Sequence, residues 1–182
     1  MTKIFAIDQS LNESGWYFDS ENYGLIKYKR KDKGKITQKI KIDRLLSIKN
    51  EIKKLIEKFQ PKVFVMEDYS FGARGSAIYN LGELGGMIKL LVVGRGLELK
   101  IVNPLLLKKF ITGKGNARKD AMLLYVFKNF GFETTNHNIA DAFSLHRFYS
   151  EYLEWKDGKE FSEHKKQCFE KFEGKKLKKK VK

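Results

Sequence analysis

The chain has 182 residues, the length of one ordinary domain, which is enough to bury a hydrophobic core. Hydrophobic residues make up 42% of the sequence, which excludes wholesale disorder. The formal net charge of +15 comes from 37 Lys and Arg against 22 Asp and Glu; it argues against a metabolic enzyme for neutral substrates and indicates a polyanionic partner, with nucleic acid the first candidate.

Two further features of the sequence indicate where the protein is located. A membrane surface would attract the same positive charge, but no apolar run approaches the roughly 20 residues that span a bilayer. No signal peptide opens the chain either, so we expect a cytoplasmic protein with no membrane partner. The single cysteine, Cys168, fits a reducing compartment and lies in a charged tail, where we expect no reactive role.

Three strands are expected at the start of the chain, over residues 3–8, 14–19 and 23–29, with turn-forming residues between them. Together they predict an antiparallel meander. Residues 36–59 then carry apolar side chains at helical spacing between lysines, which predicts a long amphipathic helix that ends before Pro61.

The next elements alternate between strand and helix. Residues 63–66 form a short, continuously apolar run, which is typical of a strand buried on both faces. A helix is expected over about residues 78–93, and a fifth strand over residues 99–102. Three glycines lie near the apolar side of this helix: Gly82, Gly85 and Gly86. They suit either tight packing on the sheet or a helix crossing at a dimer interface.

The last part of the chain is helical and basic. Short helices flank the lysine-rich loop ITGKGNARK, and a final helix is expected over about residues 139–152. We expect one domain over residues 1–155, followed by a basic extension, residues 156–182, that is partly disordered and attracts phosphates without specificity. The order of elements predicts an α/β fold with a mixed five-stranded sheet flanked by helices.

Three acidic residues lie at the end of an apolar strand or on the apolar face of a helix. Asp8 ends the first strand and Glu67 the fourth, so both meet at one edge of the sheet if these strands are parallel neighbours. Asp141 shares a helix face with Leu145 and Phe148, so it faces inward. Each acid alone would also suit a turn or an ion pair, but three acids at one point need cations to neutralise them.

Oxygen ligands of this kind favour Mg²⁺ or Mn²⁺, and no set of Cys and His residues indicates zinc. Metal ions held by carboxylates in a strongly basic protein indicate phosphodiester hydrolysis, in which two ions activate a water and stabilise the leaving oxygen. Basic residues surround the glycine-containing loop and are expected to hold the strand that is cut: Lys108, Lys109, Lys114, Arg118 and Lys119. A merely solvated loop is the alternative.

Four segments, in this order, resemble the motif blocks of RuvC Holliday junction resolvases in their bacteriophage form: FAIDQSLNESGW, VMEDYSFGARGSAIYNLGELGGMI, LKKFITGKGNARKDAM and NIADAFSL. The resemblance covers most of residues 3–150. It implies a ribonuclease H-like fold, a homodimer, and Mg²⁺- or Mn²⁺-dependent cutting of branched DNA, which includes four-way junctions and extends to forks and three-way junctions.

Carried over by position, the resemblance implies roles for individual residues. Lys108 and Lys119 match two lysines beside the scissile phosphate. Phe71 matches an aromatic that wedges against bases at the junction centre, although a loop Phe that closes the core is the alternative. Arg74 lies in the same loop and is expected to contact DNA. Three acids match the catalytic carboxylates: Asp8, Glu67 and Asp141.

One position departs from the family pattern. Bacterial members pair the last acid with another acid three residues earlier, where this chain has Asn138. An amide oxygen is an uncharged, weak ligand, so the second metal ion would be poorly held unless His137 takes its place. An engineered Asp to Asn change would produce the same sequence. We therefore expect metal ligands at Asp8, Glu67, Asn138 and Asp141, with His137 as a substitute.

Two other functions stay open on the sequence alone. The segment IDQSLNESGW also suits the phosphate-binding hairpin of actin-like sugar kinases, but such kinases need two domains and a longer chain. The other is a protein that binds branched DNA and cuts it weakly or not at all because of Asn138.

Overall fold

The computed structural model describes residues 2–29, 34–69 and 76–174. Its centre is a five-stranded sheet with the strand order β3-β2-β1-β4-β5. β1, β2 and β3 are antiparallel, whereas β1, β4 and β5 are parallel, so the predicted mixed sheet is confirmed. The strands are β1 (Ile4–Asp8), β2 (Glu13–Tyr17), β3 (Tyr23–Lys27), β4 (Val63–Glu67) and β5 (Glu98–Val102).

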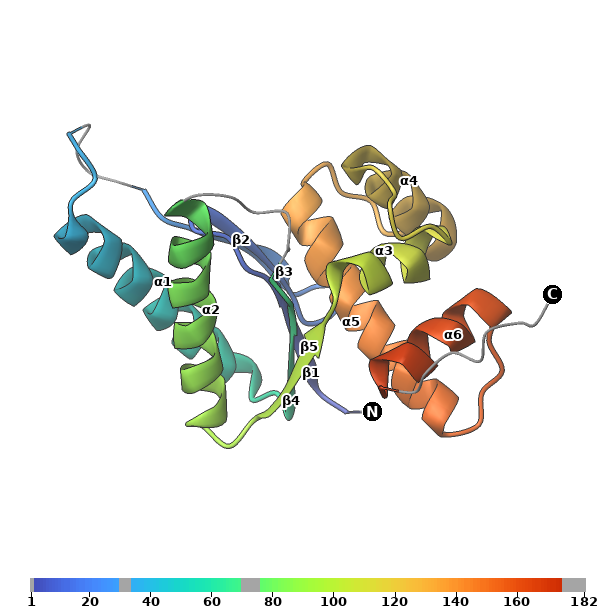
Figure 1. Ribbon diagram of the computed structural model, residues 1–182. Helices are drawn as coiled ribbons and strands as arrows, with labels where there is room; N and C mark the ends of the chain where they lie inside the picture. The colour runs from blue at the N-terminus through green and yellow to red at the C-terminus, as the bar shows by residue number, and fades with distance from the viewer. Residues whose placement is uncertain (1, 30–33, 70–75, 175–182) are drawn as a thin grey trace.

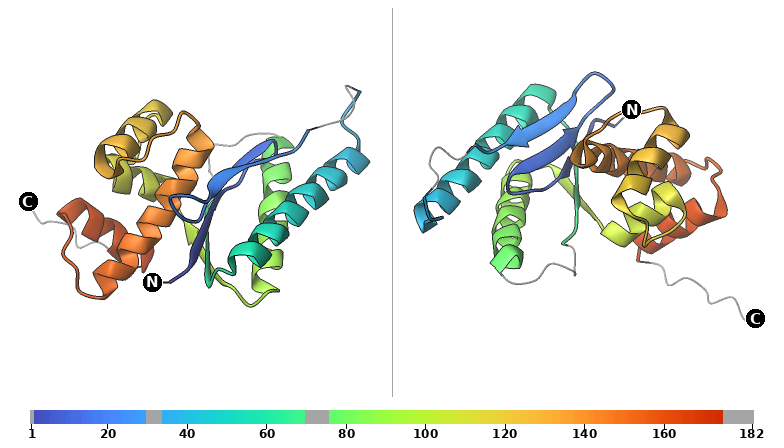
Figure 2. Two further views of the ribbon diagram at one scale, coloured as in Figure 1. Left: turned by 180° about the vertical axis from the view of Figure 1, so that it is seen from behind. Right: turned by 90° about the horizontal axis from the view of Figure 1, so that it is seen from above.

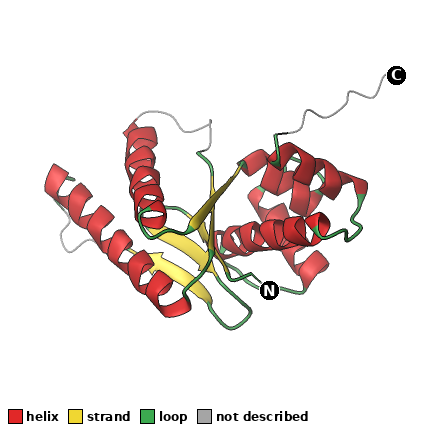
Figure 3. Cartoon of the chain, turned by 90° about the horizontal axis from the view of Figure 1, so that it is seen from below, coloured by secondary structure: helices red, strands yellow, loops and turns green. Residues whose placement is uncertain are grey.

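Helices cover both faces of this sheet (Figures 1 and 2). α1 (Gln38–Phe59) and α2 (Ser76–Val93) pack on one face, and α5 (His137–Lys156) lies against β1 and β2 on the other. Figure 3 shows the remaining helices grouped on the α5 side. They are α3 (Pro104–Thr112), α4 (Lys119–Phe130) and α6 (Glu163–Phe172). Across the described part of the chain, no helix combines the length and apolar character needed to cross a bilayer.

The hydrophobic core has two halves, one on each face of the sheet. Ile4 and Ala6 of β1 belong to the half that contains α5, whereas Phe5 and Ile7 belong to the half that contains α1 and α2. Side chains of a strand point to alternate faces. Whether a strand residue packs against α5 or against α1 and α2 therefore depends on the face of the sheet to which its side chain points.

The start of α5 is defined by Asn136. Its side chain accepts hydrogen bonds from the backbone amides of Asn138 and Ile139, which would otherwise lack a partner in the first turn. The helix consequently begins at His137, two residues before the predicted start, and continues to Lys156.

α6 lies beyond residue 155, the expected end of the domain, and packs on the core. Cys168 and Phe169 on this helix are fully buried. The ring of Phe169 lies 5.9 Å from that of Phe110 on α3 and 5.7 Å from that of Phe148 on α5. The extension expected from residue 156 onward is therefore part of the core as far as α6, because its few apolar residues share one helix face. Residues 175–182, where disorder was also expected, lie outside the described residues.

Candidate active site

Asp8 and Glu67 end neighbouring parallel strands. Asp8 follows Ala6 in the alternation of β1, and Ala6 lies in the half of the core that contains α5. Glu67 follows Val65 in the same way on β4. The register of the two strands sets their last residues side by side at the carboxyl edge of the sheet. Both carboxylates are therefore directed to the face that α5 covers.

Asp141 approaches the same edge from the helix side. It lies about one turn before Leu145 and two turns before Phe148, both of which are fully buried against the sheet. α5 packs on β1 and β2, and Asp141 is half-buried like the other two acids. The structure thus places the three acids on one face and at one end of the sheet.

These acids do not form a closed metal cage by themselves. Among the residues that the structure describes, no three His, Cys, Asp or Glu side chains are grouped closely enough to hold a metal ion. Their chemistry nonetheless fits Mg²⁺ or Mn²⁺, because half-buried carboxylates from three separate elements offer hard oxygen donors. Carboxylates that converge on a common site at this edge would repel one another unless a cation compensated their charge.

The two further candidate ligands are engaged elsewhere. The side chain of His137 is 38% exposed, and its Nε2 lies 3.9 Å from Oδ1 of Asp120 on α4. Asn138 donates from Nδ2 to the backbone carbonyl of Glu13 on β2 at 2.7 Å. His137 thus faces α4 and the amide nitrogen of Asn138 faces β2, so metal binding by either residue stays a prediction.

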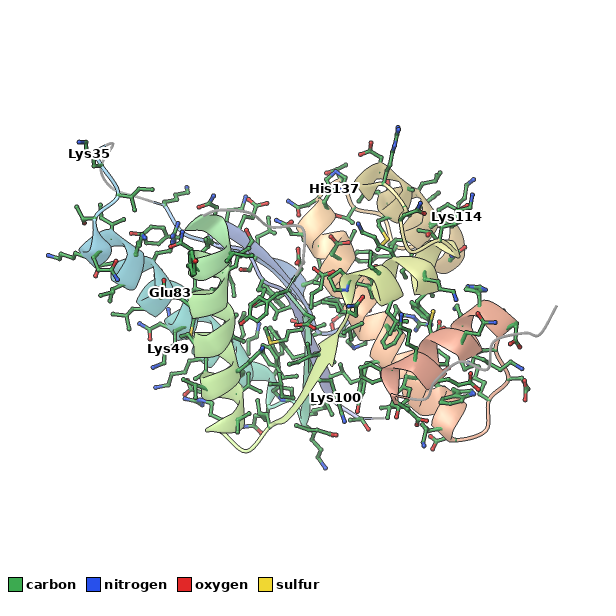
Figure 4. All side chains as sticks on the ribbon, viewed as in Figure 1. Lys35, Lys49, Glu83, Lys100, Lys114 and His137 are labelled. Atoms are coloured by element: carbon green, nitrogen blue, oxygen red, sulfur yellow. The ribbon has the colours of Figure 1, made fainter. Side chains whose placement is uncertain are left out.

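The basic residues expected to contact DNA lie on α3, on α4 and in the loop between them. Lys108 and Lys109 are half-buried on α3, and Nζ of Lys109 donates to the side-chain oxygen of a glutamine on α6 at 3.0 Å. Lys114 and Arg118 are exposed in the loop, and Lys119 begins α4. Figure 4 shows Lys114 at the end of the molecule where α5 begins.

The loop after α3 has a defined shape. The hydroxyl of Thr112 donates to the backbone carbonyl of Lys108 at 2.8 Å and accepts from the backbone amide of Lys114 at 3.1 Å. Gly113 follows the last residue of α3 with φ at 78°, a left-handed backbone conformation that residues with a side chain rarely adopt. The exposed lysine of the loop is therefore presented by an ordered turn.

Gln9 is a residue of this edge that the sequence analysis missed. Its Nε2 donates to the backbone carbonyl of Glu67 at 3.2 Å, which ties the end of β1 to the end of β4. Its Oε1 is buried and has no hydrogen-bond partner in the described part of the chain. The only signal in the sequence is its place directly after Asp8. Phe71 and Arg74, by contrast, lie outside the described residues.

Comparison with known proteins gives two kinds of match. Residues 4–146 match the family model described as Crossover junction endodeoxyribonuclease RuvC. A relative of that description from Rickettsia typhi is 30% identical over 146 residues, which cover 78% of this chain and 92% of the relative. Another, from Roseiflexus sp., is 27% identical over 124 residues, which cover 66% of this chain and 73% of the relative.

Solved structures confirm the expected ribonuclease H-like fold. Thermus thermophilus RuvC has a TM-score of 0.66 at 16% identity, covering 84% of this chain and 96% of that chain. T. thermophilus RuvC in complex with Holliday junction substrate has a TM-score of 0.65 at 18% identity, covering 82% of this chain and 95% of that chain. These relatives come from bacteria, so the expectation that the chain is a bacteriophage form of the family is not borne out.

Proposed function

The chain belongs to the RuvC family of crossover junction endodeoxyribonucleases, and from this premise we propose that it cuts Holliday junctions by metal-dependent phosphodiester hydrolysis. The observation that carries the proposal is the placement of Asp8, Glu67 and Asp141 on one face and at one edge of the sheet. The comparisons favour neither a DNA-binding protein without cleavage nor an actin-like phosphotransferase. A cytoplasmic location is part of the proposal, since the single cysteine fits a reducing compartment.

The three acids would hold Mg²⁺ or Mn²⁺, with two ions per site. A further ligand would come from His137 and not from Asn138, whose side-chain amide is engaged by Glu13. Such ions supply an activated water and charge compensation at the leaving 3′ oxygen. The contribution of the protein is to hold the carboxylates on β1, β4 and α5, three elements joined by a packed core. Their positions are therefore set before DNA binds.

Basic side chains would hold the DNA strand beside these acids. Lys108 and Lys119 would position the scissile phosphate and compensate its charge. Lys109, Lys114 and Arg118 would contact neighbouring phosphates, which fixes the register of the backbone without reading its sequence. Contacts to the backbone suit branched DNA of several kinds, so forks and three-way junctions are proposed as further substrates. Base contacts at the junction centre would come from Phe71 and Arg74.

Synthetic four-way, three-way, fork and linear DNA, each with Mg²⁺, Mn²⁺ or EDTA, test this function. We expect nicks in the four-way junction with either metal ion, none with EDTA, and slower or no cutting of the linear duplex. Cutting that persists in EDTA would contradict a metal-dependent site. Equal cutting of linear DNA would contradict junction selectivity.

The outer side of α2 is the surface proposed for a homodimer. A Cβ at Gly82 or Gly86 would meet no described atom within 4 Å, so these glycines do not pack on the sheet. Gly85 faces inward, where a Cβ would overlap the ring of Tyr69. Leu90 is 78% exposed and lines a groove of about 740 Å³ along this side of α2. An open glycine surface beside exposed apolar residues suits close packing of a second helix.

Opposite charges in the groove favour a second copy of this chain as the partner. Lys49 of α1 and Glu83 of α2 both line it (Figure 4). Around a two-fold axis the same surface meets itself, so a lysine and a glutamate on one copy can pair with the glutamate and lysine of the other. Two-fold symmetry would also offer two active sites to the two equivalent strands of a four-way junction.

The dimer proposal is tested by substitution of one exposed leucine. Leu90→Glu places a charge in the contact, so we expect size-exclusion chromatography with light scattering to give a dimer for the parent and a monomer for the variant. Leu124→Glu is the matched control, because Leu124 is 48% exposed but lies on α4. A monomeric parent, or a dimeric Leu90→Glu variant, would contradict the proposal.

A further inference from the structure

The first turn of α5 is bound to β2 by two asparagine side chains. Asn138 donates from Nδ2 to the backbone carbonyl of Glu13 at 2.7 Å, and Asn136 donates from Nδ2 to Oε1 of Glu13 at 2.7 Å. The other carboxylate oxygen of Glu13 lies 2.9 Å from Nζ of Lys27 on β3. Hydrogen bonds from Lys27 and Asn136 lower the pKa of Glu13, so its carboxylate stays ionised in this network. The network joins β3, β2 and the helix that carries Asp141.

Close approach at Gly15 brings this network beside the acids. Gly15 lies opposite Asp8 in the pairing of β1 and β2. A Cβ at Gly15 would overlap the backbone carbonyl of Asn138, so α5 touches the sheet there without an intervening side chain. Glu13 is at the start of β2, before the residues of β2 that pair with β1. Its backbone carbonyl accepts a hydrogen bond from the side-chain amide of Asn138 on α5. Position 138 is thus fixed against the strand next to Asp8.

The hydrogen bond at this position requires a donor. A carbonyl oxygen only accepts hydrogen bonds, and an ionised carboxylate has no hydrogen to give. An acid at position 138 would therefore leave the Glu13 carbonyl without this partner and set a negative charge against it. The amide is fitted to this chain, whereas the acid that the family resemblance implies at this position would not be.

We propose that Asn138 is a positioning residue, whose amide docks α5 on β2 and thereby sets Asp141 against Asp8. The role in cleavage rests on the nuclease function proposed above. Asn138 acts through the helix, and the three carboxylates are the ligand set of the site. Asn138→Asp is therefore expected to weaken the enzyme, the opposite of the result expected if Asn138 were a lost metal ligand.

Melting temperature and amide hydrogen exchange in EDTA test the docking without metal or DNA. Loss of one part-buried hydrogen bond should lower the melting temperature of Asn138→Ala and Asn138→Asp by about 3–8 °C, with the larger fall for the added charge. Amides in the first turn of α5 should exchange faster in both variants. An unchanged melting temperature and unchanged exchange in both would overturn the proposal.

Cleavage kinetics separate positioning from a merely structural role. A displaced Asp141 should lower kcat by about 10–100-fold in both variants while the affinity for a four-way junction in EDTA stays that of the parent. Asn129→Asp is the matched control: Nδ2 of Asn129 donates to the backbone carbonyl of Ile111 at 2.9 Å, a bond of the same kind between α4 and α3. The Asn129→Asp variant should have a lower melting temperature than the parent and the same kcat.

Three results would overturn the positioning role. They are an unchanged kcat in both Asn138 variants, a faster Asn138→Asp enzyme, and a larger rise in melting temperature on Mg²⁺ addition for Asn138→Asp than for the parent. The last two would mean that position 138 supplies a ligand. A parent that cuts no junction would refute the proposed function instead, and the melting and exchange results would still decide whether Asn138 docks α5.

Discussion

His146 is a half-buried imidazole on the same helix as Asp141. Its ring lies 5.0 Å from that of Tyr17 on β2, and its Nδ1 has no hydrogen-bond partner among the described residues. Burial lowers the pKa of His146 from 6.5 to about 4, and the nearby Arg147 guanidinium adds to this effect. The folded protein therefore keeps this imidazole neutral, whereas the unfolded chain takes up a proton below pH 6.5.

The sign of the resulting pH dependence follows from the lowered pKa. The contribution of His146 to stability is complete above pH 6.5 and is lost as the pH falls toward 4. At pH 5 the loss amounts to about 2 kcal/mol. His146→Gln removes the titration, so between pH 7 and pH 5 the parent should lose about 2 kcal/mol more unfolding free energy than the variant in urea titrations. Equal losses would contradict a neutral imidazole at His146 in the folded protein.

The acids of the site could be proposed from the sequence, whereas the role of Asn138 could not. Asp8 and Glu67 end apolar runs, and Asp141 has helical spacing to Leu145; each of these signals is local in the sequence. The bond from Asn138 joins residues 125 positions apart, and it depends on close approach at Gly15. Only the folded arrangement brings such a donor and acceptor together.

Among the elements, α6 lies in the segment that the sequence indicated as a basic extension. Seven of its ten residues, EHKKQCFEKF, are charged or polar, and this composition indicated a solvated tail. Cys168, Phe169 and Phe172 nevertheless share one face, which packs on the α3 and α5 side of the core. Burial raises the pKa of the Cys168 thiol to about 11, so this residue is a packed, unreactive side chain. A narrow apolar face was sufficient because aromatic rings bury a large area.

Phe169→Ala tests whether α6 is part of the folded domain. Removal of a fully buried phenylalanine ring should lower the free energy of unfolding by about 3–5 kcal/mol, measured by urea titration. Lys171→Ala is the control on the exposed side of the same helix and should change this free energy little. If the two variants were equally stable, α6 would not contribute to the core.

For the molecule as a whole, the fold separates two proposed surfaces. The sheet stands between them, with the outer side of α2 on one flank and the basic α3–α4 region on the other (Figure 1). The acids lie at the edge of the sheet on the α5 side. The surfaces proposed for dimer formation and for DNA contact therefore lie on different faces of the chain, so a substitution in one is expected to leave the other intact.

Cleavage of a four-way junction in Mg²⁺ by Asp8→Asn, Glu67→Gln and Asp141→Asn tests most directly whether the three acids form one site. Each variant should cut at least about 100-fold more slowly than the parent, because each loses one of the charged ligands proposed for the metal ions, and each should still bind the junction in EDTA. Asp43→Asn, at an exposed acid on α1, is the matched control and should cut like the parent. Cleavage at the parent's rate by any one of the three variants would contradict a single site built from all three acids.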